Sequence, residues 1–191
     1  LIKRGRLGFR LSNAIYMEII PREIAFVPQL NFESNYDPLW YIKDNGFLDM
    51  QLLLKAFQDF FRQHSEHWLE RFQYKEAGPQ LLMQAFLQRI VNGGGRVERE
   101  YGYGRKRFDL FVLWKNKNDV QKVVIELKIR YGDLEKTITK GLEQTFKYMD
   151  KCGTDQGHLV IFDRRKKKTW EEKVFTRQEV FQGKRIMVWG M

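Results

Sequence analysis

The sequence predicts an α/β (α+β) protein in which a helical first half is followed by a mixed central sheet. Two observations predict this class: apolar residues recur at helical spacing as far as residue 90, and from residue 97 the hydrophobic period changes to two. The run Asn92-Gly93-Gly94-Gly95 between the two regions is a strong signal for the end of a helix. From residue 77 onward the predicted element order is α-β-β-β-α-β, followed by a β-rich tail.

The helical half contains two long amphipathic segments. Apolar side chains follow helical spacing over residues 49–73 and again over residues 81–90, with Gly78-Pro79 between them. Shorter pieces precede them: a hairpin-like alternation over residues 5–11, and a helix from Ser12 or Asn13 to about residue 20. We therefore expect a mainly helical accessory segment over residues 1–76 and a main domain over residues 77–191.

In the second half, polar and glycine-containing turns delimit the strands. Gly104-Arg105-Lys106 and the polar run at residues 115–119 divide the alternating pattern into three successive strands. A helix follows, with apolar residues on one face and Gly153 at its end. The expected strands are residues 97–103, 107–114, 122–129, 158–162 and 184–189, and the expected helix is residues 134–151.

Charge and composition narrow the class of protein. The chain of 191 residues has a formal net charge of +10, and residues 91–191 hold 23 basic against 14 acidic side chains. We expect this basic half to face a polyanion, most simply a nucleic acid. No apolar run approaches the ~20 residues of a membrane span. The single cysteine, Cys152, excludes an internal disulfide. A cytoplasmic protein that binds no membrane fits these features.

The most informative residues are charges inside strands that are otherwise apolar. Asp109 interrupts one such strand, and Glu126 and Lys128 interrupt the next. Burying a charge without a partner is costly, so such residues persist when they are paired or bind a metal. By the two-residue period of a strand, Glu126 and Lys128 project from one face. We expect antiparallel pairing of the two strands to bring the Asp109 carboxylate beside that of Glu126.

Two carboxylates and a lysine at one point of a sheet suit phosphodiester chemistry. Carboxylate oxygens select a hard cation, Mg²⁺ or Mn²⁺, whose charge offsets the repulsion between the acids. Such a cation activates water for hydrolysis, and Lys128 can orient that water or stabilise charge in the transition state. Ordinary ion pairs are the alternative: Asp109 with Arg105 or Arg107, and Glu126 with Lys122 or Lys128.

Asp109 followed by Glu126-Leu127-Lys128, within this element order, resembles the PD-(D/E)XK nuclease superfamily over roughly residues 77–163. Gln144 and Tyr148 on the next helix match the QxxxY pattern of its RecB-like branch. The resemblance implies a restriction-endonuclease-like core and a nuclease that cleaves DNA with Mg²⁺ or Mn²⁺. It implies Asp109 and Glu126 as metal ligands, the backbone carbonyl of Leu127 as a third, Lys128 as the catalytic lysine, and Gln144 and Tyr148 facing the active site.

Stretches outside these motifs resemble the nuclease-like domain that follows a P-loop ATPase module in prokaryotic archaeal-type ATPase proteins. They are residues 91–95, 98–102, 104–109 and 157–163. This resemblance implies an ATPase module as partner in the parent chain, with residues 1–30 as the remnant of a winged-helix-like region. The chain itself has no GxxxxGK[ST] motif.

Two departures from the superfamily pattern motivate an alternative function. Phe108 stands where the superfamily often has proline. The acid of the first helix has three unranked candidates, Glu76, Glu98 and Glu100. The alternative is a catalytically inactive nucleic-acid-binding or assembly module attached to an ATPase, and whether the chain acts as a homodimer stays open.

Basic residues near the predicted site are candidates for contacts with nucleic acid. Lysines at helical spacing, in line with Gln144, form a row on the helix of residues 134–151 that can follow a phosphate backbone. The turn before the Asp109 strand adds further basic residues. The candidates are Arg105, Lys106, Arg107, Lys136, Lys140 and Lys147.

Overall fold

The computed structural model describes residues 2–5, 8–11, 40–71, 77–91, 94–103, 106–117, 119–165 and 167–191. The chain divides into two compact units, Leu1–Trp40 and Tyr41–Met191. In the first unit, β1 (Ile2–Gly5) and β2 (Gly8–Leu11) pair antiparallel, as the alternation near residues 5–11 suggests. The helix expected to begin at Ser12 or Asn13 lies outside the described residues.

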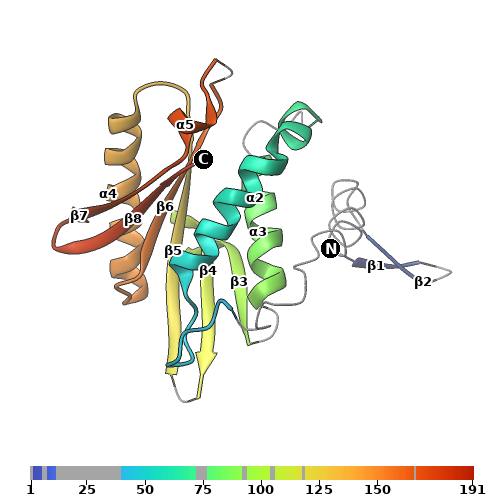
Figure 1. The fold of residues 1–191 in the computed structure, drawn as a ribbon. Helices are drawn as coiled ribbons and strands as arrows, with labels where there is room; N and C mark the ends of the chain where they lie inside the picture. Colours follow the sequence, from blue (N-terminus) through green and yellow to red (C-terminus); the bar gives the residue numbers. More distant parts are fainter. Residues whose placement is uncertain are drawn as a thin grey trace. The chain divides into compact units, whose positions relative to one another are not determined.

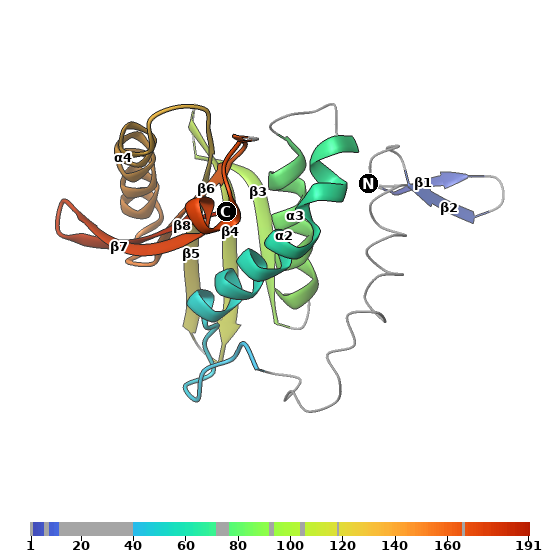
Figure 2. The ribbon, with the colours of Figure 1, turned by 45° about the horizontal axis from the view of Figure 1, so that its top comes forward.

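The second unit is a mixed α/β layer structure, which confirms the α/β part of the predicted fold class (Figure 1). Helix α4 (Leu134–Cys152) covers one face of a six-stranded sheet, and α2 (Met50–Arg71) and α3 (Ala77–Val91) cover the other, as both views show (Figure 2). The strand order is β3-β4-β5-β6-β8-β7. The strands are β3 (Gly95–Tyr103), β4 (Lys106–Asn116), β5 (Asp119–Arg130), β6 (Gly157–Asp163), β7 (Phe175–Phe181) and β8 (Lys184–Gly190).

The order α3-β3-β4-β5-α4-β6 is the predicted α-β-β-β-α-β. The sequence pattern located neither the short helix α5 (Trp170–Lys173) nor β7. Strand β7 escapes a hydrophobicity pattern because it is an edge strand with mostly polar residues. It pairs antiparallel with β8 through a tight turn at Gln182 and Gly183, which both have positive φ. The boundary expected near residue 76 lies inside the second unit.

Helix α4 packs closely on the sheet and is defined at both ends. Asp133 caps its start by accepting a hydrogen bond from Lys136 N at 2.7 Å, and Gly153 ends it in the left-handed conformation. Gly141 faces Leu159 so closely that an added Cβ would lie 2.5 Å from the leucine side chain. This glycine therefore sets how near α4 lies to the sheet. The buried cluster on this face includes Val124, Ile138, Leu142, Met149, Leu159, Ile161, Ile186 and Val188.

The opposite face of the sheet is held by aromatic packing and one buried amide. The rings of Phe57 and Phe61 on α2 pack against that of Phe162 on β6, with centroids 6.5 and 5.1 Å away. Gln58 Nε2 donates to the carbonyl oxygen of Gly190 at 2.7 Å. These contacts make α2 part of the same unit as the sheet. None of the described helices has the length and hydropathy to span a bilayer.

The pairing of β4, β5 and β6 positions the candidate site. Strands β4 and β5 are antiparallel, and their register ends at the pair Leu110 and Ile125. Strands β5 and β6 are parallel and connected by α4. The residues of β5 after Ile125 therefore remain paired with β6 but are no longer paired with β4.

Candidate active site

Asp109 and Glu126 lie at the point where β4 and β5 separate. Extending the register by one step places Asp109 opposite Glu126, on the face that α4 covers. In place of a ladder bond, the Asp109 carboxylate accepts a hydrogen bond from Leu127 N, with Oδ2 2.8 Å away. The structure therefore brings the two predicted acids together, as antiparallel pairing requires.

Glu126 is a buried carboxylate with one partnered and one unpartnered oxygen. Its relative exposure is 1%, and its Oε1 lies 2.5 Å from Lys128 Nζ. Among the described residues, its Oε2 has no hydrogen-bond partner. Burial, with the nearby negative charge of Asp109, raises the pKa of Glu126 to about 7, although Lys128 opposes the shift. This carboxyl group is thus poised to change charge near neutral pH.

A chain of hydrogen bonds runs from Glu126 to helix α4. Lys128 Nζ donates to Gln144 Oε1 at 2.8 Å as well as to Glu126. Gln144 Nε2 lies 3.2 Å from the Tyr148 hydroxyl. Burial raises the pKa of Tyr148, the Gln144 hydrogen bond lowers it, and the charges of Glu126 and Asp109 raise it further, with a net increase. The helix therefore fixes the position of the lysine ammonium.

The oxygen atoms of Asp109, Glu126 and the Leu127 carbonyl are ligands that suit a hard cation. Backbone N–H and C=O of one strand residue point to the same side, so the Leu127 carbonyl, like its N–H, points toward Asp109 and the end of the β4 ladder. Two carboxylates and a carbonyl are oxygen ligands of the kind that Mg²⁺ and Mn²⁺ prefer. The unpartnered Oε2 of Glu126 is an observation that fits such an ion. In the described part of the chain, no three His, Cys, Asp or Glu side chains form a metal-binding group.

The predicted nucleic-acid contacts divide into two sets. Lys136, Lys140 and Lys147 are exposed on α4, on the stripe that leads to Gln144. Glu143 shares this stripe and reduces its net charge. Arg105 lies outside the described residues, and Lys106 and Arg107 are described only as backbone positions that open β4.

The acid of the first helix is not assigned to one residue. Glu98 and Glu100 are on β3, and Glu76 lies outside the described residues. Glu98 pairs with Arg96 at 2.5 Å and is opposite Phe111 in the register. In the register of β3 and β4, Arg99 pairs with Leu110 and Tyr101 pairs with Phe108. The backbone of Glu100 therefore lies opposite that of Asp109.

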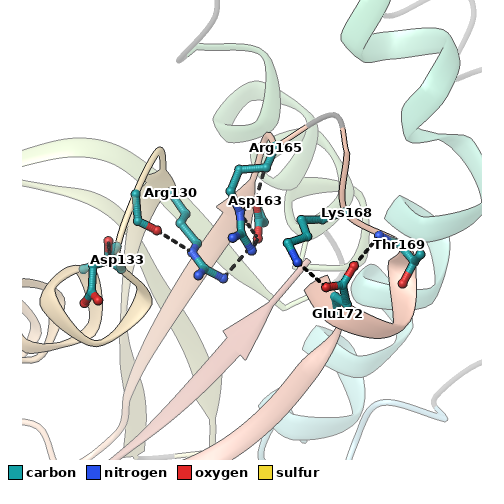
Figure 3. Close-up of polar contacts among 9 residues, drawn as sticks. Arg130, Asp133, Asp163, Arg165, Lys168, Thr169 and Glu172 are labelled. Atoms are coloured by element: carbon teal, nitrogen blue, oxygen red, sulfur yellow. Dashed lines mark hydrogen bonds and ion pairs between the residues drawn. The ribbon is translucent and has the colours of Figure 1, made fainter.

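One polar cluster on the same sheet was not predicted from the sequence (Figure 3). Asp163, at the end of β6, has a side chain only 3% exposed and binds two arginines. Arg165 donates through Nε and Nη2, at 2.9 and 2.7 Å, and Arg130 donates through Nη1 at 3.2 Å. Burial raises the pKa of Asp163, but hydrogen bonds and charge from Arg165 and Arg130 outweigh it, and the net pKa is lowered. The sequence does contain a signal for this cluster, because Arg130 ends β5 and the oppositely charged Asp163 ends β6.

Chemically, Asp109, Glu126, Lys128 and Gln144 combine oxygen atoms that could hold a cation, an ammonium group and an amide that orients this ammonium group. Those are the elements needed to hold a phosphodiester and deliver water to it. In comparisons with known proteins, the chain matches no family model, and no curated protein or solved structure matches it.

Proposed function

We propose that this chain is a Mg²⁺-dependent nuclease that hydrolyses phosphodiester bonds in DNA at Asp109, Glu126 and Lys128. The observation that carries the proposal is the buried Glu126 carboxylate, which feels the charge of Asp109 and has one oxygen held by Lys128 and the other without a partner among the described residues. A buried carboxylate next to a second, partly buried acid is electrostatically unfavourable, and a divalent ion bound to both would lower that cost.

The order and pairing of the elements support the finer assignment. Strand β4 carries the first acid, β5 carries the second acid and the lysine, and α4 carries Gln144 and Tyr148. We propose on this basis that residues 77–163 form a restriction-endonuclease-like core of the PD-(D/E)XK type. Its attachment to a P-loop ATPase module belongs to the same proposal.

Each residue has a separate role in the proposed reaction. Asp109, Glu126 and the Leu127 carbonyl would hold Mg²⁺, which supplies positive charge to the phosphate and acidifies the attacking water. Lys128 has three N–H groups, and its contacts with Glu126 and Gln144 use two of them. The third can bind a phosphate oxygen or the water. Gln144, itself bonded to Tyr148, keeps the ammonium at that position.

The test is metal-dependent cleavage of plasmid and single-stranded DNA by the wild-type chain and by Glu126→Gln. Glutamine keeps the volume and one acceptor of the side chain but removes its charge. Glu171→Gln on α5, an exposed acid that pairs with Arg62, is the matched control. We expect Mg²⁺-dependent nicking by wild type and control and none by Glu126→Gln.

Two outcomes would count against the enzyme. Equal cleavage by Glu126→Gln would remove this site from the reaction. DNA binding that needs no metal, with no cleavage by any variant, would favour the alternative of a nucleic-acid-binding module. Isothermal titration of Mg²⁺ and Mn²⁺ into wild type distinguishes a site that binds metal without turnover from one that binds none.

A further inference from the structure

The arginine cluster at the end of β5 and β6 has unused binding capacity. A guanidinium group carries five N–H donors. The described contacts of Arg130, to Asp163 and to the Gly132 carbonyl, use two of them, and those of the Arg165 side chain, both to Asp163, also use two. Two positive groups share one carboxylate, so the cluster has a net positive charge. The side chains of Arg130 and Arg165 are 13% and 28% exposed, which leaves part of each at the surface.

Two neighbouring acids are already engaged in other contacts, although the charge of Glu172 still acts on Arg165. Asp133 is engaged as the cap of α4, and Glu172 binds Lys168 and Thr169 N (Figure 3). The segment that carries Arg165 also contains Arg164 and Lys167. Asp163 holds both guanidinium groups in fixed positions, which suits recognition of a phosphate.

The cluster lies on the same sheet face as the candidate active site. Arg130 follows Lys128 by two residues in β5, so both project toward the α4 side, and Arg130 is directly opposite Asp163. At about 3.3 Å per residue, Arg130 is about 13 Å along the strand from Glu126. A nucleic-acid strand with a phosphate at Glu126 reaches the arginines within a few nucleotides.

An exposed aromatic residue adjoins the cluster. Tyr131, the residue after Arg130, is 63% exposed, although most large hydrophobic side chains of this unit are buried. It stands at the turn between β5 and α4, beside Gly132, around which there is open space. Tyr131 is next to Arg130 in the sequence, and proteins that bind unpaired nucleotides combine positive charge with aromatic rings that stack on the bases.

We propose that Arg130, Arg165 and Tyr131 form a binding subsite for single-stranded nucleic acid next to the active site. The two arginines bind a backbone phosphate, Asp163 positions them, and Tyr131 stacks on an unpaired base. The idea that this subsite binds the same strand that is cleaved rests on the proposed nuclease function. The binding itself does not require cleavage.

The test is equilibrium binding of a fluorescein-labelled oligothymidylate and of a mixed-sequence duplex of equal length, followed by anisotropy in EDTA. We expect Tyr131→Ala to weaken single-strand binding by about 5- to 100-fold, the contribution of one stacked base, and to change duplex binding by less than about twofold. Tyr131→Phe keeps the ring and should retain single-strand affinity. Arg165→Ala should weaken binding of both DNAs and lower the salt dependence of single-strand binding by about 0.7 in slope, with Arg165→Lys as the variant that keeps the charge.

Unchanged single-strand binding by Tyr131→Ala, or an equal loss on both DNAs, would overturn the subsite. Circular dichroism and thermal melting of each variant separate a loss of contact from a loss of fold. Asp59→Asn on α2, an exposed acid on the opposite side of the sheet that pairs with Lys55, is the control and should bind the oligonucleotide as wild type does. The two proposals can therefore be tested separately: the binding assay tests the subsite, and the cleavage assay tests the nuclease.

Discussion

The backbone N–H of Leu127 donates to Asp109 Oδ2 at 2.8 Å, at the first step beyond the last registered pair of β4 and β5. A side chain thus replaces the ladder bond that the departing strand no longer supplies. The same contact fixes the Asp109 carboxylate beside Glu126. Asp109 thus contributes both to the stability of the fold and to the proposed chemistry, and different substitutions of this residue can separate the two contributions.

Asp109→Asn should retain the fold and lose metal binding. The amide oxygen can still accept the Leu127 hydrogen bond, but the missing charge should lower Mg²⁺ affinity by more than about tenfold. Asp109→Ala should in addition lower the free energy of unfolding by about 1–3 kcal/mol, because Leu127 N–H is left without its acceptor. Calorimetric metal titration and urea denaturation measure the two effects. Equal metal affinity in Asp109→Asn would exclude this carboxylate as a ligand.

Metal affinity should rise with pH up to about 7. Metal binds the ionised carboxylate, and the pKa of Glu126 is raised to about 7, so protons compete with the cation below that value. The apparent affinity should increase by up to about tenfold per pH unit from pH 5.5 to 7 and then level off. Titration calorimetry across this range tests it. An affinity that is constant from pH 5.5 to 8 would contradict a ligand with this pKa.

His158 and Glu126 should oppose each other in the pH dependence of stability. Burial lowers the pKa of His158 to about 4, and its ring nitrogen accepts a hydrogen bond from Trp189 Nε1 at 3.2 Å. The unfolded chain binds the histidine proton more tightly, so this group stabilises the fold above about pH 6.5, and the contribution is lost as pH falls toward 4. Glu126 has a raised pKa, so its contribution is present below about 4.5 and is lost as pH rises toward 7.

The two contributions are each at most roughly 3 kcal/mol and largely cancel in the wild-type chain between pH 4.5 and 6.5. His158→Gln should therefore expose a fall in the free energy of unfolding as pH rises. Glu126→Gln should expose a rise. Urea denaturation at half-unit pH intervals measures both slopes. If the free energy of unfolding changed with pH in the same way in both variants, the burial of His158 and of Glu126 would not have the opposing effects described.

Gly141→Ala should destabilise the protein, although alanine is the better helix former. Alanine in place of a helical glycine normally stabilises by roughly 0.5–1 kcal/mol. Here the methyl group meets the Leu159 side chain, and we expect a net loss of about 1–3 kcal/mol. Displacement of α4 should also weaken the Gln144 contact with Lys128 and reduce cleavage. Thr139→Ala, an exposed position on the same helix, is the control. An increase in melting temperature for Gly141→Ala would show that the helix can shift without cost.

The lysine stripe of α4 should account for part of the salt dependence of DNA binding. Each phosphate contact contributes about 0.9 to the slope of log K against log salt for duplex DNA. The triple variant Lys136→Ala, Lys140→Ala, Lys147→Ala should lower that slope by up to about 2.7. A matched triple alanine variant at Lys43, Lys115 and Lys122, exposed lysines outside the stripe, should leave it nearly unchanged. Equal slopes for the two triples would remove the stripe from the DNA interface.

The sequence anticipates those features that depend on local periodicity. The two-residue period puts Glu126 and Lys128 on one face, and the structure places them 2.5 Å apart. Helical spacing puts Gln144 one turn from Tyr148, where the two side chains form a hydrogen bond. The roles of these residues remain predictions, since proximity alone assigns no reaction.

Other features depend on long-range register, which no local pattern contains. Arg130 meets Asp163 because β5 and β6 pair in parallel across the whole of α4. Helix α2 belongs with the sheet because its phenylalanines pack on Phe162. Such contacts between distant parts of the chain become visible only when the strand order is known.

All six proposed active-site residues, Leu127 included, come from one uninterrupted stretch between residues 109 and 148, in two strands and the helix that follows them. Helices α2 and α3 and the β7–β8 pair support this stretch from outside without contributing to its chemistry. We therefore expect substitutions in these flanking elements to act on the stability of the protein before they act on the positions of the carboxylates, the lysine and the glutamine.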